Sequence, residues 1–201
     1  KATDNISFTA NNTALADNSD VRALISLSKI LPKENFSAIT SVTTSEVSLA
    51  KQAIAIIKNN TNLAVDLSAI EISASDANAI AKATSGVLTA TIKDGGVAAT
   101  LKAIGDVKAT DAITFTTTDK TVKASDLVDL NAKLAGGTFT TTSINTITGG
   151  AKDVASIAAA ALIVNNADIT VSGTITAADV ATIKAAGGSG VLTANVQAAE
   201  A

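Results

Sequence analysis

Two stretches of this chain are near copies of each other, and they constrain its fold more than any other feature. Residues 73–92 and residues 176–196 follow one plan. Each has a hydroxyl residue suited to cap a helix, an Asp three residues later, a short apolar periodicity, a glycine and a strand containing Val-Leu-Thr-Ala. Copies of this kind predict a repeat protein.

Weaker copies of the same unit recur along the chain. Alignment on the third helical residue of the two copies gives seven anchor positions, of which six are acidic. They are Asp20, Glu46, Asp76, Gly96, Asp126, Asp153 and Asp179. The anchors lie 20 to 30 residues apart, and the residue after each one is apolar, as is the residue four positions on in six of the seven. This spacing predicts one apolar helix face in every unit.

The acidic anchors are predicted to serve helix starts. Four units have a typical N-cap residue three positions before the anchor: Asp17, Thr43, Ser73 and Thr176. A carboxylate in the first turn is favoured by the helix dipole. Calcium binding is the alternative, but Asp106, Asp111 and Asp119 lie in predicted loops without the spacing of a calcium-binding loop, so no cofactor is predicted.

A strand with alternating apolar and polar residues follows each predicted helix. The predicted strands cover residues 36–41, 63–67, 88–92, 113–117, 138–142, 169–172 and 191–196, with another near residues 6–9 and short ones at 70–72, 121–122 and 174–176. Helix and strand in units this short are typical of an α/β repeat solenoid of about seven units, with parallel strands on one side and short helices on the other. A single open α/β sheet domain is the alternative.

The two ends of the chain differ in regularity. Residues 1–42 are less regular and are predicted to be a cap or donor segment, whereas residues 43–201 form the predicted solenoid. The last unit is a good copy of the repeat rather than an atypical cap, and an uncapped strand is a template for another chain. We therefore predict pairing with a neighbouring subunit, or with a neighbouring repeat of a longer chain. The predicted association edge comprises Val191, Leu192, Thr193, Ala194, Asn195 and Val196.

Composition argues against several function classes. The chain has no His and no Cys, which excludes most nucleophile–base pairs and structural zinc sites, so we do not expect an enzyme. A net charge of −3 with Arg22 as the single arginine argues against a nucleic-acid partner. Apolar runs such as residues 157–164 are too short to form a transmembrane segment.

Threonine dominates the predicted strand faces that point away from the core. The candidate interaction surface comprises Thr89, Thr91, Thr114, Thr116, Thr140, Thr170 and Thr193. Strands stacked in register would align five of them (89, 114, 140, 170 and 193) in ladders with a spacing of about 4.8 Å. Such rows resemble the ice-contacting faces of some antifreeze solenoids, so ice or glycan binding is an alternative function. The plainer explanation, which we favour, is that threonine suits a solvated strand face.

The repeat pattern also resembles a known group of proteins. Its Val-Leu-Thr-Ala strands, its Ala-Ser-Asp and Ala-Ala-Asp helix starts and its Thr, Ala and Val bias are similar to repeats of very large secreted bacterial proteins, such as cyanobacterial surface-layer and adhesin-like proteins. The resemblance spans residues 40–196 and implies an extracellular or cell-surface location. We therefore predict a non-catalytic structural protein of a surface layer, filament or adhesin.

Overall fold

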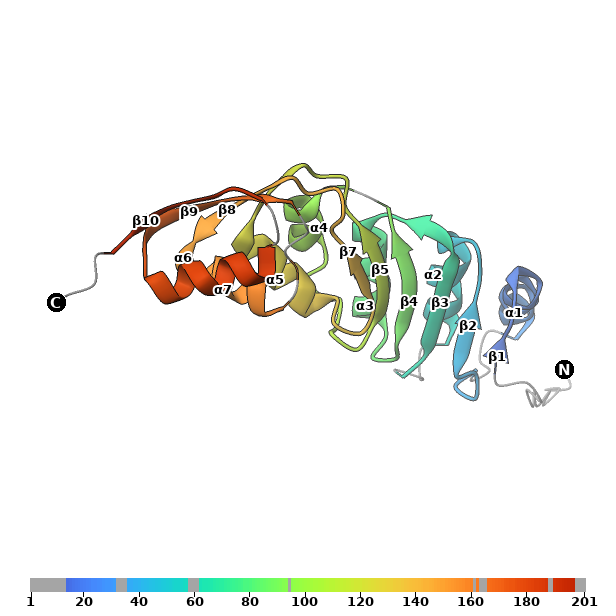
Figure 1. The fold of residues 1–201 in the computed structure, drawn as a ribbon. Coiled ribbons are helices and arrows are strands. Elements are labelled where there is room, and N and C mark those ends of the chain that lie inside the picture. The colour runs from blue at the N-terminus through green and yellow to red at the C-terminus, as the bar shows by residue number, and fades with distance from the viewer. Residues whose placement is uncertain are drawn as a thin grey trace, which may run out of the picture.

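The 201-residue chain was analysed as a computed structural model that describes residues 14–31, 36–57, 62–93, 95–160, 162, 166–187 and 190–197. Within these residues, seven helices alternate with parallel strands in two sheets (Figure 1). The predicted α/β class is confirmed. The interpretation of the units as a solenoid stays a prediction.

The first sheet contains six strands, and every pairing in it is parallel. Its order is β1 (Ala14–Leu15), β2 (Ser41–Thr43), β3 (Ala64–Ile72), β4 (Leu88–Ile92), β5 (Ala112–Thr116) and β7 (Thr138–Thr140). Chain order and sheet order therefore agree along this sheet, with β6 as the one strand that is passed over.

The second sheet contains four parallel strands. Its order is β6 (Thr121–Lys123), β8 (Thr146–Gly150), β9 (Asp168–Ile175) and β10 (Leu192–Val196). The prediction placed all strands along one side, whereas the chain leaves the first sheet after β5. The Thr117 N–H still bonds to Thr140 of the first sheet, and residues 118–120 then lead into β6 of the second. Because of this short connection, the consecutive strands β5 and β6 belong to different sheets.

The helices lie between successive strands, and each one contacts the next helix in the chain. They are α1 (Asn18–Ile30), α2 (Val47–Ile56), α3 (Ala74–Ala83), α4 (Val97–Ala103), α5 (Ala124–Lys133), α6 (Ala151–Ala159) and α7 (Ala177–Gly187). The predicted helix faces are confirmed in the core. In α3, Ala77 and Ile80 are fully buried, and in α5, Leu127 and Leu130 are fully buried.

The strands contribute the other half of the core through their alternation. In β4 the side chains of Leu88, Ala90 and Ile92 are buried, whereas Thr89 and Thr91 are only partly covered. Burying alternate apolar residues of stacked strands against the helices removes them from water, at about 25 cal/mol for each Å² of apolar surface. One contiguous cluster of buried residues runs from Val21 in α1 to Ile183 in α7.

Several predicted strand boundaries were wrong. Residues 36–40 are not a strand: Phe36 and Ile39 are buried from a turn, and β2 begins only at Ser41. The strand predicted at residues 70–72 is the end of β3, and that at 174–176 is mostly the end of β9. The short strand β1 and the glycine-ending strand β8 were missed. The predicted strand at residues 6–9 lies outside the described residues.

Gly149 explains why β8 was missed. Its residue pair Gly149 and Gly150 is typical of a turn, yet both residues pair with β9. A Cβ atom at position 149 would lie 2.8 Å from the Cβ of Ala124 at the start of α5. Close approach of helix and strand, rather than a turn, therefore requires glycine here.

Candidate interaction surfaces

Threonine rows form in the first sheet, but in a different register from the predicted one. Thr114 lies between Thr91 on β4 and Thr138 on β7. Thr116 pairs with Thr140 in the next outward row. Thr89 pairs with Asp66 and Ala112, so it does not belong to the row of Thr114.

A separate threonine row crosses the second sheet. Thr170 lies between Thr148 on β8 and Thr193 on β10, and Lys123 continues the row on β6. Thr170 and Thr193 are exposed. The five threonines predicted to align therefore do not share one row: Thr114, Thr140 and the pair Thr170 and Thr193 lie in three different rows, and Thr89 lies in none of them. What these rows bind stays a prediction.

The predicted association edge is the outer strand of the second sheet. Within the described residues, β10 pairs only with β9. Val191 is 63% exposed and Val196 is 53% exposed. The alternation of β10 places Val196 on the same face as Leu192 and Ala194, yet more than half of its surface is exposed. Its equivalent in β4, Ile92, is 2% exposed because β5 covers the far side of β4.

In the part of the chain that the structure describes, one side of the β10 backbone has no strand beside it. On the other side, the carbonyl of Val191 accepts a hydrogen bond from β9, and the N–H of Gln197 donates one to β9. Backbone groups of alternate strand residues point to opposite sides. The N–H and C=O groups that point away from β9 therefore belong to Leu192, Ala194 and Val196.

In three units, the predicted cap residue and the acidic anchor form a hydrogen bond at the start of the helix, as predicted. The Asp17 carboxylate accepts the N–H of Asp20 at 3.1 Å, and the Ser73 hydroxyl accepts that of Asp76 at 3.0 Å. At α7 the bonds are reciprocal: Thr176 Oγ1 accepts the Asp179 N–H at 3.1 Å, and Asp179 accepts the Thr176 N–H at 2.9 Å. This pair has the geometry of a capping box.

The second unit departs from that plan. Thr43 is the last residue of β2, so its predicted role as an N-cap is wrong. Glu46 itself stands at the N-cap of α2, and its N–H donates to the Thr44 hydroxyl at 3.1 Å. The helix α2 therefore begins one residue after its anchor, whereas α3 begins two residues before its anchor Asp76.

Three carboxylates at these helix starts have pKa values below the ordinary range. The Lys51 ammonium, 2.6 Å from the Asp76 carboxylate, and then the Ser73 hydroxyl lower the pKa of Asp76. Hydrogen bonds from the Thr176 N–H and hydroxyl lower the pKa of Asp179, and those from Ser19 and Asp20 lower that of Asp17. Protein donors supply these effects, and no group of three or more metal-ligating side chains occurs in the described residues.

The structure reveals one buried carboxylate that the sequence did not single out for this role. Asp111 is fully buried, and its two oxygens accept the backbone N–H groups of Leu88 at 2.9 Å and Lys108 at 2.8 Å. The Lys108 ammonium donates to the carbonyls of Thr84 and Gly86. An Asp directly before an alternating strand is the local feature that marks this position.

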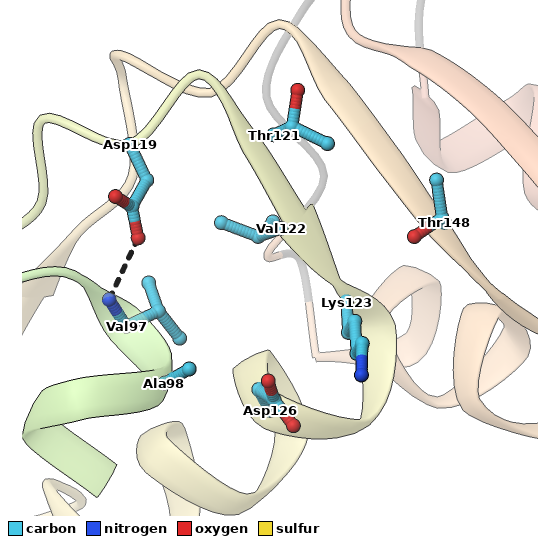
Figure 2. A pocket seen from close by; sticks show the side chains of 8 residues that line it. All are labelled: Val97, Ala98, Asp119, Thr121, Val122, Lys123, Asp126 and Thr148. Carbon is cyan, nitrogen blue, oxygen red and sulfur yellow. Dashed lines mark hydrogen bonds between the residues drawn. The ribbon is translucent and has the colours of Figure 1, made fainter.

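A cavity of about 310 Å³ lies between the starts of α4 and α5 and the strands β6 and β8 of the second sheet (Figure 2). Its lining residues are Val97, Ala98, Asp119, Thr121, Val122, Lys123, Asp126 and Thr148. The Asp119 carboxylate already accepts the Val97 N–H at the start of α4, at 2.7 Å. This carboxylate therefore has a structural task, and we place no ligand in the cavity.

No helix among the described residues combines the length and apolar character needed to cross a membrane. Comparisons with protein-family models, curated proteins and solved structures found no match to this chain.

Proposed function

We propose that this chain is a structural, non-catalytic repeat protein that self-associates in an extracellular assembly at the cell surface, such as a surface layer, a filament or an adhesin. One observation carries the proposal: β10 belongs to a near copy of the unit that contains β4, yet no strand of the described residues lies beside its far edge. In a stack of repeats, each unit buries its apolar residues against its neighbours.

The exposed residues support this role. Val196 occupies the register position of Ile92, and its exposure of 53% compares with 2% for Ile92. Apolar side chains beside unpaired backbone groups favour the addition of another strand. The resemblance to secreted bacterial repeats adds the location, and the absence of His and Cys from the sequence supports a role without catalysis.

Sedimentation of the purified chain over a wide concentration range tests self-association. We expect the mean mass to rise with concentration, whereas a substitution that blocks β10 lowers the mass. Imaging of the native cell surface with a labelled antibody tests location and should show an ordered layer or fibre. A chain that stays monomeric at all concentrations, together with an unlabelled cell surface, would refute the proposal.

Ice or glycan binding is the second candidate, supported by the rows of three threonines in each sheet. Thermal hysteresis and glycan-array binding measure these activities. Replacing Thr114, at the centre of its row, with lysine should abolish either activity, whereas replacing Lys102 on α4 should not. Absence of both activities in the unmodified chain would remove this candidate.

A further inference from the structure

The second sheet repeats the construction of the first. Strands β6, β8, β9 and β10 pair in the same order and direction as β1, β2, β3 and β4. The central apolar row of the second sheet is Val122, Ile147, Ile169 and Leu192, which corresponds to Leu15, Val42, Val65 and Leu88 in the first. A register shift also recurs, in β3 after Leu67 and in β9 after Thr170. Thus β10 corresponds to β4 in both sequence and position.

Residues 108–117 cover the far side of β4. Within this segment, β5 places Ile113 beside Ala90 and Phe115 beside Ile92. Asp111, just before the strand, accepts the outward N–H of Leu88. The side chains of Asp111, Ile113 and Phe115 are all fully buried. These three side chains therefore attach this segment to the β4 edge, together with the backbone pairing of β5 and β4.

Residues 1–10 have almost the same sequence as residues 108–117. The two segments are Lys-Ala-Thr-Asp-Asn-Ile-Ser-Phe-Thr-Ala and Lys-Ala-Thr-Asp-Ala-Ile-Thr-Phe-Thr-Thr. Asp4, Ile6 and Phe8 take the places of the three buried attachment residues. Two of the three differences fall at positions 112 and 114, which are not buried in β5. Residues 1–10 themselves lie outside the described part of the structure.

We propose that residues 1–10 of a second copy of this chain bind along the open edge of β10, as residues 108–117 bind along β4. The Asp4 carboxylate then accepts the outward N–H of Leu192. Ile6 lies beside Ala194, and Phe8 covers Val196. This inference names the contact behind the proposed self-association and rests on it.

A second copy is the source of the segment because of where the strands lie. Residues 1–10 precede β1, and β1 and β10 stand at opposite ends of the described fold (Figure 1). The segment of one copy therefore meets β10 of another when the copies are arranged head to tail. Parallel pairing is retained, as in every other strand pair of the two sheets.

Gly190, just before β10, makes the same close approach to the preceding repeat as Gly86 does before β4. A Cβ atom on Gly190 would lie 1.9 Å from the Ala167 carbonyl oxygen, and one on Gly86 would lie 2.3 Å from that of Leu63. Both strands thus start from the same close crossing. One contact differs between the two edges. The Gly86 carbonyl accepts a hydrogen bond from Lys108, which belongs to the segment that covers β4. The Gly190 carbonyl instead accepts a hydrogen bond of 2.9 Å from Lys184, which belongs to the same repeat as β10. Recognition therefore depends on Asp4, Ile6 and Phe8 rather than on Lys1.

The test uses a fluorescent synthetic peptide of residues 1–10, titrated with the full chain and followed by anisotropy. We expect saturable binding. An Asp4→Ala peptide should bind at least about tenfold more weakly, because a hydrogen bond to a charged group is lost. The matched Asn5→Ala peptide changes an outward position and should bind within about twofold of the original. These peptide variants leave the folded chain unchanged.

A chain variant locates the binding edge. Ala194→Pro removes one N–H that points away from β9, which a sheet edge tolerates, whereas Ala194→Ser keeps that N–H. Circular dichroism and thermal unfolding check that both variants fold. We expect peptide binding to be lost with proline and kept with serine. Absence of saturable binding, or binding that survives both Asp4→Ala and Ala194→Pro, would overturn the inference. If the chain still assembles in that case, the proposed structural function stands and only this contact is wrong.

Discussion

The carboxylate of Asp111 and the backbone N–H of Leu88 form a hydrogen bond of 2.9 Å that joins two successive repeats. Asp111 has no exposed surface, and its second oxygen accepts the N–H of Lys108. The Lys108 ammonium lies 3.5 Å from the carboxylate. A buried charge is tolerated where it is paired and hydrogen-bonded, so Asp111 serves as a structural tie between β4 and β5.

Removal of this carboxylate should destabilise the fold. We expect Asp111→Ala to lower the free energy of unfolding by about 3 kcal/mol, because two backbone N–H groups lose their acceptor and the Lys108 ammonium loses its counter-charge. Asp111→Asn retains one oxygen acceptor and should cost only about 1 kcal/mol. Urea denaturation measures both values. Equal losses in the two variants would show that the oxygen retained in asparagine contributes nothing to stability.

The helix face of the last repeat can be tested at Ile183, which is fully buried. We expect Ile183→Ala to lower the free energy of unfolding by about 2–5 kcal/mol through lost burial and the cavity left behind. Val191→Ala, at a position that is 63% exposed, is the control and should change it by less than about 0.5 kcal/mol. A loss at Ile183 as small as that at Val191 would contradict the assigned face.

Gly86 is expected to tolerate no side chain. An added Cβ would lie 2.3 Å from the carbonyl oxygen of Leu63, which is backbone and cannot rotate away. Gly86→Ala should therefore cost about 1–3 kcal/mol, or several degrees in melting temperature. Gly105→Ala is the matched control, since no atom lies within 4 Å of its added Cβ. Calorimetry showing equal melting temperatures for both variants would contradict the close crossing.

The lowered pKa of Asp76 predicts the direction of a pH effect. A carboxylate with a lowered folded-state pKa stabilises the fold above its unfolded pKa of about 4, and this contribution is lost as the pH falls through the folded-state value. Lys51→Met should raise the pKa of Asp76 and leave that of Asp179 unchanged, because Thr176 sets the latter. Carboxyl carbon chemical shifts followed by NMR measure both values. An unchanged pKa for Asp76 would show that the ion pair with Lys51 does not form in solution.

Local sequence information was sufficient to predict the helix and the strand of the most regular repeats, such as residues 73–92. Ser73 and Asp76 define a helix start within four residues, and Ala77 and Ile80 define its buried face. The alternation of residues 88–92 defines a strand in the same way. These features depend on neighbours in the chain, which is why their prediction succeeded.

Features that depend on distant segments were not predictable in this way. The role of Asp111 depends on an N–H group 23 residues away in the chain. The division into two sheets depends on residues 118–120, which carry no strong turn pattern. The exposure of Val196 depends on what lies beyond β10, and a repeat pattern alone assumes that every unit has two neighbours.

Parallel pairing throughout both sheets makes the two ends of the stack chemically different, since one end presents β1 and the other presents β10. Two β10 edges related by a two-fold axis would meet antiparallel, so a closed symmetric dimer cannot reproduce this pairing. In the head-to-tail assembly that we propose, growth through these edges would be polar, because the two ends of the assembly would differ. A molecule that blocks one end stops elongation there, while the opposite end continues to add subunits.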